Sequence, residues 1–128
     1  MLPFPIRILP GQPIYEQLVH AVKKALATGH LKPGDRFPAV RVISTELGVN
    51  PNTVQKAATV LINMGILEVR SGQGSFIAEP SLTGDIKSRL KPLEPLVENL
   101  LIEAARQGLD EEEILSLVQN HLRKLKRP

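Results

Sequence analysis

The polar residues best suited to specific contacts with a ligand lie at the start of one predicted helix. They are Asn50, Asn52, Thr53, Gln55 and Lys56. Asparagine and glutamine amides can pair with N6 and N7 of adenine, and a lysine ammonium suits a phosphate. DNA-reading helices insert this end first. The pattern favours contact with nucleic acid, while Asn50 equally suits an N-cap that serves only its own helix.

A second polar cluster lies between two short predicted strands at 66–70 and 75–78. It comprises Arg70, Gly72, Gln73 and Gly74. The two glycines let the main chain approach a phosphate closely, and the arginine offers a cationic contact. Alternatively, the hairpin needs its glycines only for the turn, and Arg70 lies on a solvated strand face. Both interpretations place a protruding hairpin after the polar helix.

Other chemistries find little support in the composition. The chain has no cysteine, which excludes disulfides, thiolate metal sites and cysteine nucleophiles. The spacing of His20, His30 and His121 matches no metal motif, and no paired carboxylates, Ser-His-Asp set or phosphate-binding loop stands out. The sequence therefore predicts a protein without cofactor or metal that is not an enzyme. A small enzyme remains the weaker alternative.

The elements that must position these residues follow from apolar periodicity and turn signals. Apolar residues at helical spacing predict helices at 14–28, 39–47 and 51–64, the third burying Val54, Ala57, Ala58 and Leu61. Gly29 is the expected C-cap of the first helix, and a type II turn at 31–35 and a short strand at 36–37 are expected after it. Gly48 permits a sharp turn before the third helix, where Pro51 suits the first helical position. Two helices, a glycine turn, a capped helix and a hairpin predict a winged helix-turn-helix. A helical domain with an ordinary hairpin is the alternative.

The segment 79–84, rich in Pro, Ser and Gly, divides the chain into a DNA-binding domain at 1–78 and a helical tail at 85–128. Pro92 and Pro95 predict a kink or a restart in the first tail helix. Asp110 with Glu113 three residues later predicts a capping pair at the start of the second. The tail has more apolar positions than a two-helix hairpin can hide, so we expect them to pair with a second copy. Docking onto the chain's own first domain is the alternative. The predicted dimerisation residues are Leu93, Leu96, Val97, Leu100, Leu101, Ile114, Leu117, Val118 and Leu122.

Charge is distributed unevenly along the chain. Residues 1–78 contain eight Lys or Arg and four Asp or Glu, whereas residues 79–128 contain eight and nine. A basic front half favours an anionic partner. No run approaches the roughly 20 apolar residues needed to cross a bilayer. We therefore expect a cytoplasmic protein without a membrane partner. The predicted elements make its fold class mainly α with one small β-hairpin.

Several motifs resemble, in order, the N-terminal domain of GntR-family regulators. The resemblance covers roughly residues 13–78 without a gap. The roughly 50 residues after this domain suffice for two helices but not for a separate ligand-binding fold. In this respect the chain resembles the YtrA subfamily, which has a short helical tail. The matching segments are Pro13-Ile14-Tyr15-Glu16-Gln17-Leu18, Leu31-Lys32-Pro33-Gly34-Asp35-Arg36-Phe37-Pro38, Arg41, Leu47-Gly48-Val49-Asn50, Thr53-Val54 and Gly72-Gln73-Gly74-Ser75-Phe76-Ile77.

The resemblance implies a DNA-binding transcription regulator, expected as a repressor, whose homodimer binds an imperfect palindrome in a double-stranded operator. Arg41 matches an arginine through which the family contacts DNA, and its guanidinium fits a guanine edge or a phosphate. This chain has Pro51 and Gln55 where many relatives carry arginine. We therefore expect its operator to present adenines to Asn52 or Gln55.

Two alternatives keep the same fold. A winged helix can serve as a protein-interaction adaptor that never touches DNA, and the roles of Arg41, Lys56 and the hairpin discriminate between the two functions. The short tail also leaves room for a small-molecule effector between two subunits, without indicating one.

Overall fold

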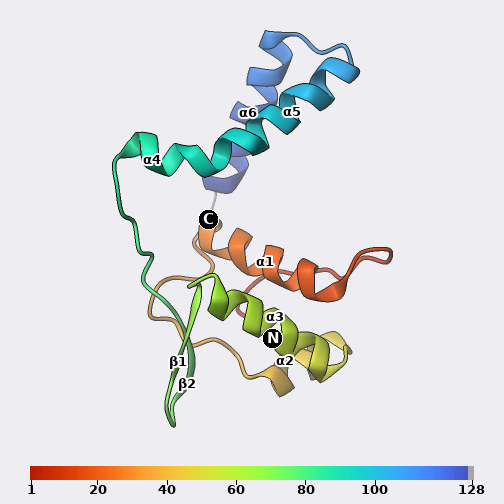
Figure 1. Cartoon of the computed structure of the whole chain (residues 1–128). Helices are drawn as coiled ribbons and strands as arrows, with labels where there is room; N and C mark the ends of the chain where they lie inside the picture. Colours follow the sequence, from red (N-terminus) through yellow and green to blue (C-terminus); the bar gives the residue numbers. More distant parts are fainter. Residues whose placement is uncertain (127–128) are drawn as a thin grey trace. The chain divides into compact units, whose positions relative to one another are not determined.

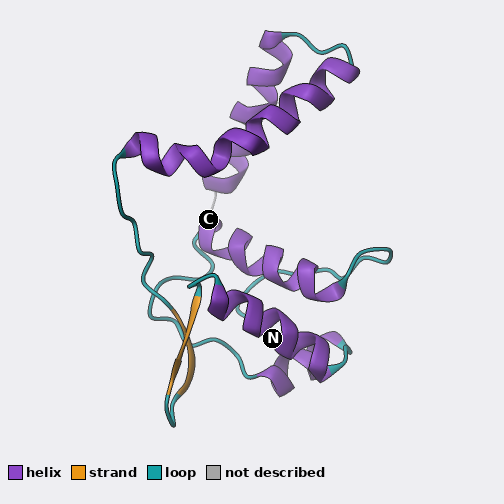
Figure 2. Cartoon of the chain, viewed as in Figure 1, coloured by secondary structure: helices purple, strands orange, loops and turns teal. Residues whose placement is uncertain are grey.

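The computed structural model describes residues 1–126 and divides into two compact units, one ending at Pro80 and the other beginning at Ser81. Helices account for most of the regular structure, and one hairpin supplies the strands (Figure 2). The first unit contains α1 (Ile14–Thr28), α2 (Val40–Leu47), α3 (Pro51–Asn63), β1 (Leu67–Arg70) and β2 (Gly74–Ile77), as labelled in Figure 1.

The core of the first unit forms where α1 and α2 both pack against α3. Apolar side chains spaced three and four residues apart make this possible, because they share one helix face. The hairpin closes the core at its base through Leu67 and Ile77. The predicted inward residues of α3 are buried, except that Ala58 is half-buried. The core includes Leu18, Val22, Ala25, Leu31, Phe37, Ile43, Val54, Ala57, Leu61, Leu67 and Ile77.

Turn chemistry fixes the path between α1 and α2. Gly29 ends α1 in the left-handed region with φ of 83°, as predicted for a C-cap. Gly34 has φ of 91°, and the Asp35 N–H donates to the Lys32 carbonyl at 3.0 Å, which closes the predicted turn. Arg36 then forms an antiparallel bridge with Phe76. The short strand predicted at 36–37 is therefore a single bridge on the outer edge of β2.

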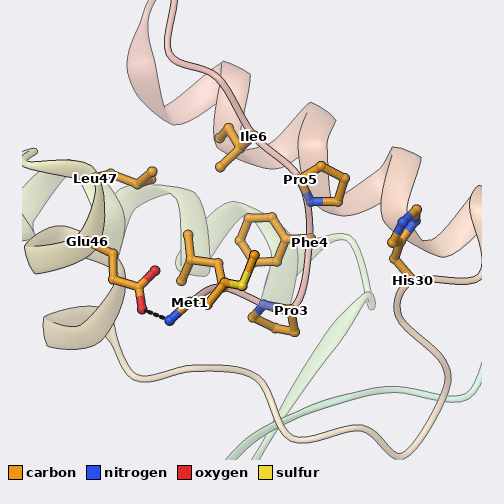
Figure 3. A pocket seen from close by; sticks show the side chains of 9 residues that line it. Met1, Pro3, Phe4, Pro5, Ile6, His30, Glu46 and Leu47 are labelled. Carbon is orange, nitrogen blue, oxygen red and sulfur yellow. Dashed lines mark hydrogen bonds and ion pairs between the residues drawn. The ribbon is translucent and has the colours of Figure 1, made fainter.

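The N-terminal segment contributes to the core, which the sequence analysis did not predict. Phe4 is only 3% exposed, and its ring stacks on Phe37 with centroids 5.9 Å apart and planes 3° apart. Figure 3 shows the open hollow that Phe4 and the other residues of this segment line together with His30, Glu46 and Leu47, and the terminal ammonium of Met1 hydrogen-bonded to Glu46. Gln17 secures the following loop by donating to the Leu9 carbonyl at 2.8 Å.

The second unit comprises α4 (Ile86–Leu90), η1 (Lys91–Leu93), α5 (Glu94–Arg106) and α6 (Glu111–Lys126). The predicted interruption is confirmed, because the short 3₁₀ turn η1 around Pro92 separates α4 from α5. The predicted capping pair is also confirmed: Asp110 accepts from the Glu113 N–H at 2.9 Å, and Glu113 accepts from the Asp110 N–H at 3.0 Å. This reciprocal cap fixes where α6 begins.

Candidate nucleic-acid interface

The turn between α2 and α3 is built by three consecutive devices. Gly48 has φ of 66°, which a residue with a Cβ rarely adopts, and the Val49 N–H donates to the Ser44 carbonyl at 3.1 Å. The Asn50 side chain accepts from the Asn52 N–H at 2.8 Å and so caps α3. Pro51 occupies the first helical position, as predicted. These devices set the direction in which α3 leaves the turn.

The first turns of α3 present a polar surface to solvent. Asn52, Gln55 and Lys56 are exposed, and Thr53 is half-buried. Val54, Ala57 and Leu61 on the opposite face are buried to 3% exposure or less. The helix thus has one face in the core and a polar leading end outside, which is the arrangement needed to enter a DNA groove.

Lys56 is held by a contact that sequence analysis missed. Its ammonium lies 4.0 Å from the ring centroid of Tyr15 on α1, a cation–π geometry. The neighbouring Glu16 carboxylate raises the pKa of Tyr15, through its charge and through the hydrogen bond it accepts from the phenol at 3.3 Å. The ring therefore stays a neutral phenol under Lys56. Only the three-dimensional packing of α1 on α3 brings these residues together.

Arg41 lies in the first turn of α2, where it is exposed. Within residues 1–126 no carboxylate forms an ion pair with it. Among the described residues, the Gln55 side chain has one hydrogen bond, a long one of 3.5 Å from its amide to the Thr59 hydroxyl. The predicted contact residues on α2 and α3 are thus accessible to a partner, at the two helices that flank the Gly48 turn.

The hairpin carries the remaining predicted contacts at its free end. Arg70 and Gly74 are paired across the strands, and the Gln73 N–H donates to the Arg70 carbonyl at 2.9 Å. Gly72 and Gly74 have φ of 74° and 102°, so both glycines are required by the turn itself. Gln73 is exposed at the tip. This hairpin, β1 with β2 and the loop between them, is the wing of the fold, and it presents the Gln73 side chain to solvent.

The predicted dimerisation residues lie in the second unit and are largely exposed. Between Ser81 and Lys126, Ala104 is the one residue classed as buried, at 5% exposure. Leu96 is 63% exposed and Leu101 46%, and Ile114 is half-buried. Leu90, Leu93, Val97, Leu101 and Ile102 line an apolar groove along α5. The second unit thus leaves these apolar side chains exposed to solvent, with no described part of the unit itself covering them.

Comparison with known proteins is consistent with this geometry. Residues 14–77 match the family model of bacterial regulatory proteins of the gntR family. The chain is 35% identical over 102 residues to the HTH-type transcriptional repressor YtrA of Bacillus subtilis (strain 168), an alignment spanning 80% of this chain and 78% of YtrA.

Solved structures agree in fold. A transcriptional antiterminator from Listeria monocytogenes EGD-e is 28% identical with a TM-score of 0.80, covering 95% of this chain and 91% of that one. The DNA-binding domain of AraR, crystallised with operator ORE1, is 25% identical with a TM-score of 0.50, covering 59% of this chain and 92% of that one.

The fold and the site define a winged helix-turn-helix protein that binds DNA and regulates transcription. The chain belongs to the GntR family of bacterial regulatory proteins. Its relatives are transcription regulators, so the prediction that it is not an enzyme is confirmed by its family. Over residues 1–126, none of the helices is both long enough and apolar enough to cross a membrane.

Proposed function

We propose that this protein is a transcriptional repressor that binds an imperfect palindrome as a homodimer. The observation that carries the proposal is the exposed polar leading end of α3, which lies opposite a buried apolar face. A helix held in this way can enter the major groove without disturbing the core. The relative YtrA is named a transcriptional repressor, and AraR is bound to an operator, which supports repression at an operator here.

The division of labour within the chain follows the two units. Residues 1–78 bind DNA, residues 79–84 connect the two units, and residues 85–128 hold two copies together. Residues 127 and 128 lie outside the described part of the chain. In the first segment, Asn52 and Gln55 contact base edges, Arg41 a guanine or a phosphate, and Lys56 a phosphate. Asn50, Thr53 and the wing residues Arg70, Gly72, Gln73 and Gly74 complete the proposed surface.

The uncovered apolar surface of the tail supports dimerisation. A helical hairpin whose leucines stay exposed has a strong reason to associate, at about 25 cal/mol for each Å² of apolar surface removed from water. A two-fold contact between identical tails covers the same residues on both copies. It also joins two DNA-binding domains, so that each raises the effective concentration of the other at the operator.

Removing the proposed cationic contacts tests whether the surface binds DNA. We expect Arg41→Ala to weaken operator binding by about 1–3 kcal/mol, and Lys56→Ala to weaken binding to all sequences and lower the salt dependence by about one counterion per protomer. Fluorescence anisotropy with a labelled operator, at several salt concentrations, measures both. Lys24→Ala, an exposed lysine on α1, is the control. If both variants bind like wild type, a protein-interaction adaptor becomes the better assignment.

Selection of bound sites from random duplexes tests how the sequence is recognised. We expect a palindrome with adenines at fixed positions in each half-site, because amide side chains pair with adenine N6 and N7. In a parallel selection, Gln55→Ala should lose the preference at one position while keeping the half-site spacing. Asn63→Ala, at the far end of the same helix, is the matched control. A wild-type consensus without adenines would exclude these roles for Asn52 and Gln55.

A further inference from the structure

The two faces of the wing differ in burial and in charge. Leu67 and Ile77 are register partners, and both are buried against the core. Side chains alternate between faces along a strand, so the next pair in the ladder, Glu68 and Phe76, projects to the opposite, outer face. The outer face carries Glu68 and Arg70 from β1, and Phe76 from β2. It is a separate surface from the tip loop at 71–73.

Arg36 joins this outer face from a distant part of the sequence. Its bridge to Phe76 is antiparallel and lies on the edge of β2 that β1 leaves free. Two backbone hydrogen bonds fix the segment there: the Phe37 N–H donates to the Ser75 carbonyl, and the Ile77 N–H donates to the Asp35 carbonyl, both at 2.8 Å. Register partners project from the same face, so Arg36 lies in one row with Phe76 and Glu68.

Gly74 has no side chain, and the Arg36 guanidinium lies beside the position that a Cβ would take. A Cβ built on Gly74 would lie 3.5 Å from Nη2 and 3.8 Å from Nε of Arg36. Across the strands, Gly74 is the register partner of Arg70, and such partners have Cβ atoms about 4.5–5.5 Å apart. The missing side chain is therefore flanked by the Arg36 guanidinium on one side and by the base of the Arg70 side chain on the other.

The two guanidinium groups differ in their partners. Arg70 lies 4.1 Å above the Phe76 ring and donates to the Glu68 carboxylate at 2.8 Å. Arg36 is exposed, and within residues 1–126 no carboxylate forms an ion pair with it. The outer face thus combines two cations with one carboxylate, around a position without a side chain. That combination suits an anion with several oxygens, which guanidinium groups bind through paired hydrogen bonds.

We propose that Arg36 and Arg70 bind one phosphate of the operator backbone over Gly74, outside the contacts of α3 and the wing tip. The proposal rests on the proposed DNA-binding function and adds Arg36 to its surface. Glu68 opposes the phosphate, since it holds Arg70 and carries a negative charge beside the site. The wing then contacts the backbone with its outer face as well as its tip.

The salt dependence of operator binding tests the proposal. The full-length protein and the operator duplex selected for it are used, with anisotropy measured between about 50 and 300 mM salt. We expect Arg36→Gln to lower the slope of log K against log salt by about 0.9 for each bound protomer, and affinity at 150 mM to fall on the order of tenfold. Arg36→Lys should keep the slope while losing part of the affinity, because it keeps the charge without the fork. Glu68→Gln should bind a few-fold more tightly.

The control variant is Lys24→Gln, which removes one exposed charge from α1 and should leave the slope unchanged. Thermal unfolding of Arg36→Gln shows that the wing is intact. A wild-type slope and affinity in Arg36→Gln would overturn the proposal, as would a loss of slope in Arg36→Lys. These results are separate from the proposed function, which fails only if the wild-type protein selects no operator or Arg41→Ala and Lys56→Ala bind like wild type.

Discussion

Glutamate in place of Leu101 is expected to separate the proposed homodimer into monomers and to lower operator affinity on the order of 100-fold or more. Leu101 lies in the apolar groove of α5 and is 46% exposed in the single chain. A glutamate there would place a charge inside the proposed contact between two tails, and burying an unpaired charge is costly. Once the copies separate, each half-site is bound singly and the gain from linking two domains is lost.

The substitution leaves the fold of the single chain intact, which makes the result interpretable. Glutamate has nearly the helix propensity of leucine, and the side chain is outside the chain's own core. Asn99→Glu provides a matched control, because it adds the same charge on the opposite, polar face of α5. Sedimentation velocity gives the oligomeric state, and anisotropy gives operator affinity. If Leu101→Glu sediments and binds like wild type, this groove is not where two copies meet.

Local signals made most of the helix boundaries predictable from sequence. Asn50 followed by Pro51 predicted where α3 starts, since an N-cap acceptor and a proline without an N–H satisfy the same end of a helix. Asp110 and Glu113 predicted the start of α6 by a reciprocal pair of hydrogen bonds. Each device acts within three residues of the chain, so its effect is encoded in the sequence nearby.

Contacts between distant segments were not predictable in this way. Arg36 and Gly74 are far apart along the chain, and only the bridge from Arg36 to Phe76 brings the guanidinium to the wing. The cation–π contact of Lys56 depends likewise on how α1 packs on α3. The predicted contact residues Asn52, Gln55 and Lys56 are exposed, as the helical period of α3 indicated. Which polar residues share one surface depends on strand edges and helix contacts, and these join distant parts of the sequence.

The N-terminal segment shows a different limit of sequence patterns. Between Met1 and Pro13 the prolines break any helical or alternating period, so no apolar face can be recognised. The segment nevertheless packs Phe4 into the core, with Leu2 and Ile6 half-buried around it. Gln17 binds the loop through hydrogen bonds at both amide atoms: Oε1 accepts from the Leu9 N–H, and Nε2 donates to the Leu9 and Gln12 carbonyls. The N-terminal segment, although it has no regular secondary structure, thus supplies part of the core against which α3 packs.

Replacing Phe4 by alanine is accordingly expected to lower the free energy of unfolding by about 3–5 kcal/mol, the usual cost of truncating a buried aromatic residue. The change removes both the buried ring and its stacking on Phe37. Urea unfolding followed by circular dichroism measures the loss. All variants are compared at one protein concentration, because association of two copies, as proposed, would add to stability. Operator affinity extrapolated to the folded fraction should stay near wild type, since Phe4 is not at the DNA surface.

Two further variants separate packing from other effects of the segment. Leu9→Ala alters a neighbouring residue that is 50% exposed and should change the free energy of unfolding by less than about 0.5 kcal/mol. Phe4→Leu keeps most of the volume and should cost about 1.5 kcal/mol or less. If Phe4→Ala is no more destabilising than Leu9→Ala, the segment does not belong to the core. The scaffold that presents α3 would then consist of the helices and the hairpin alone.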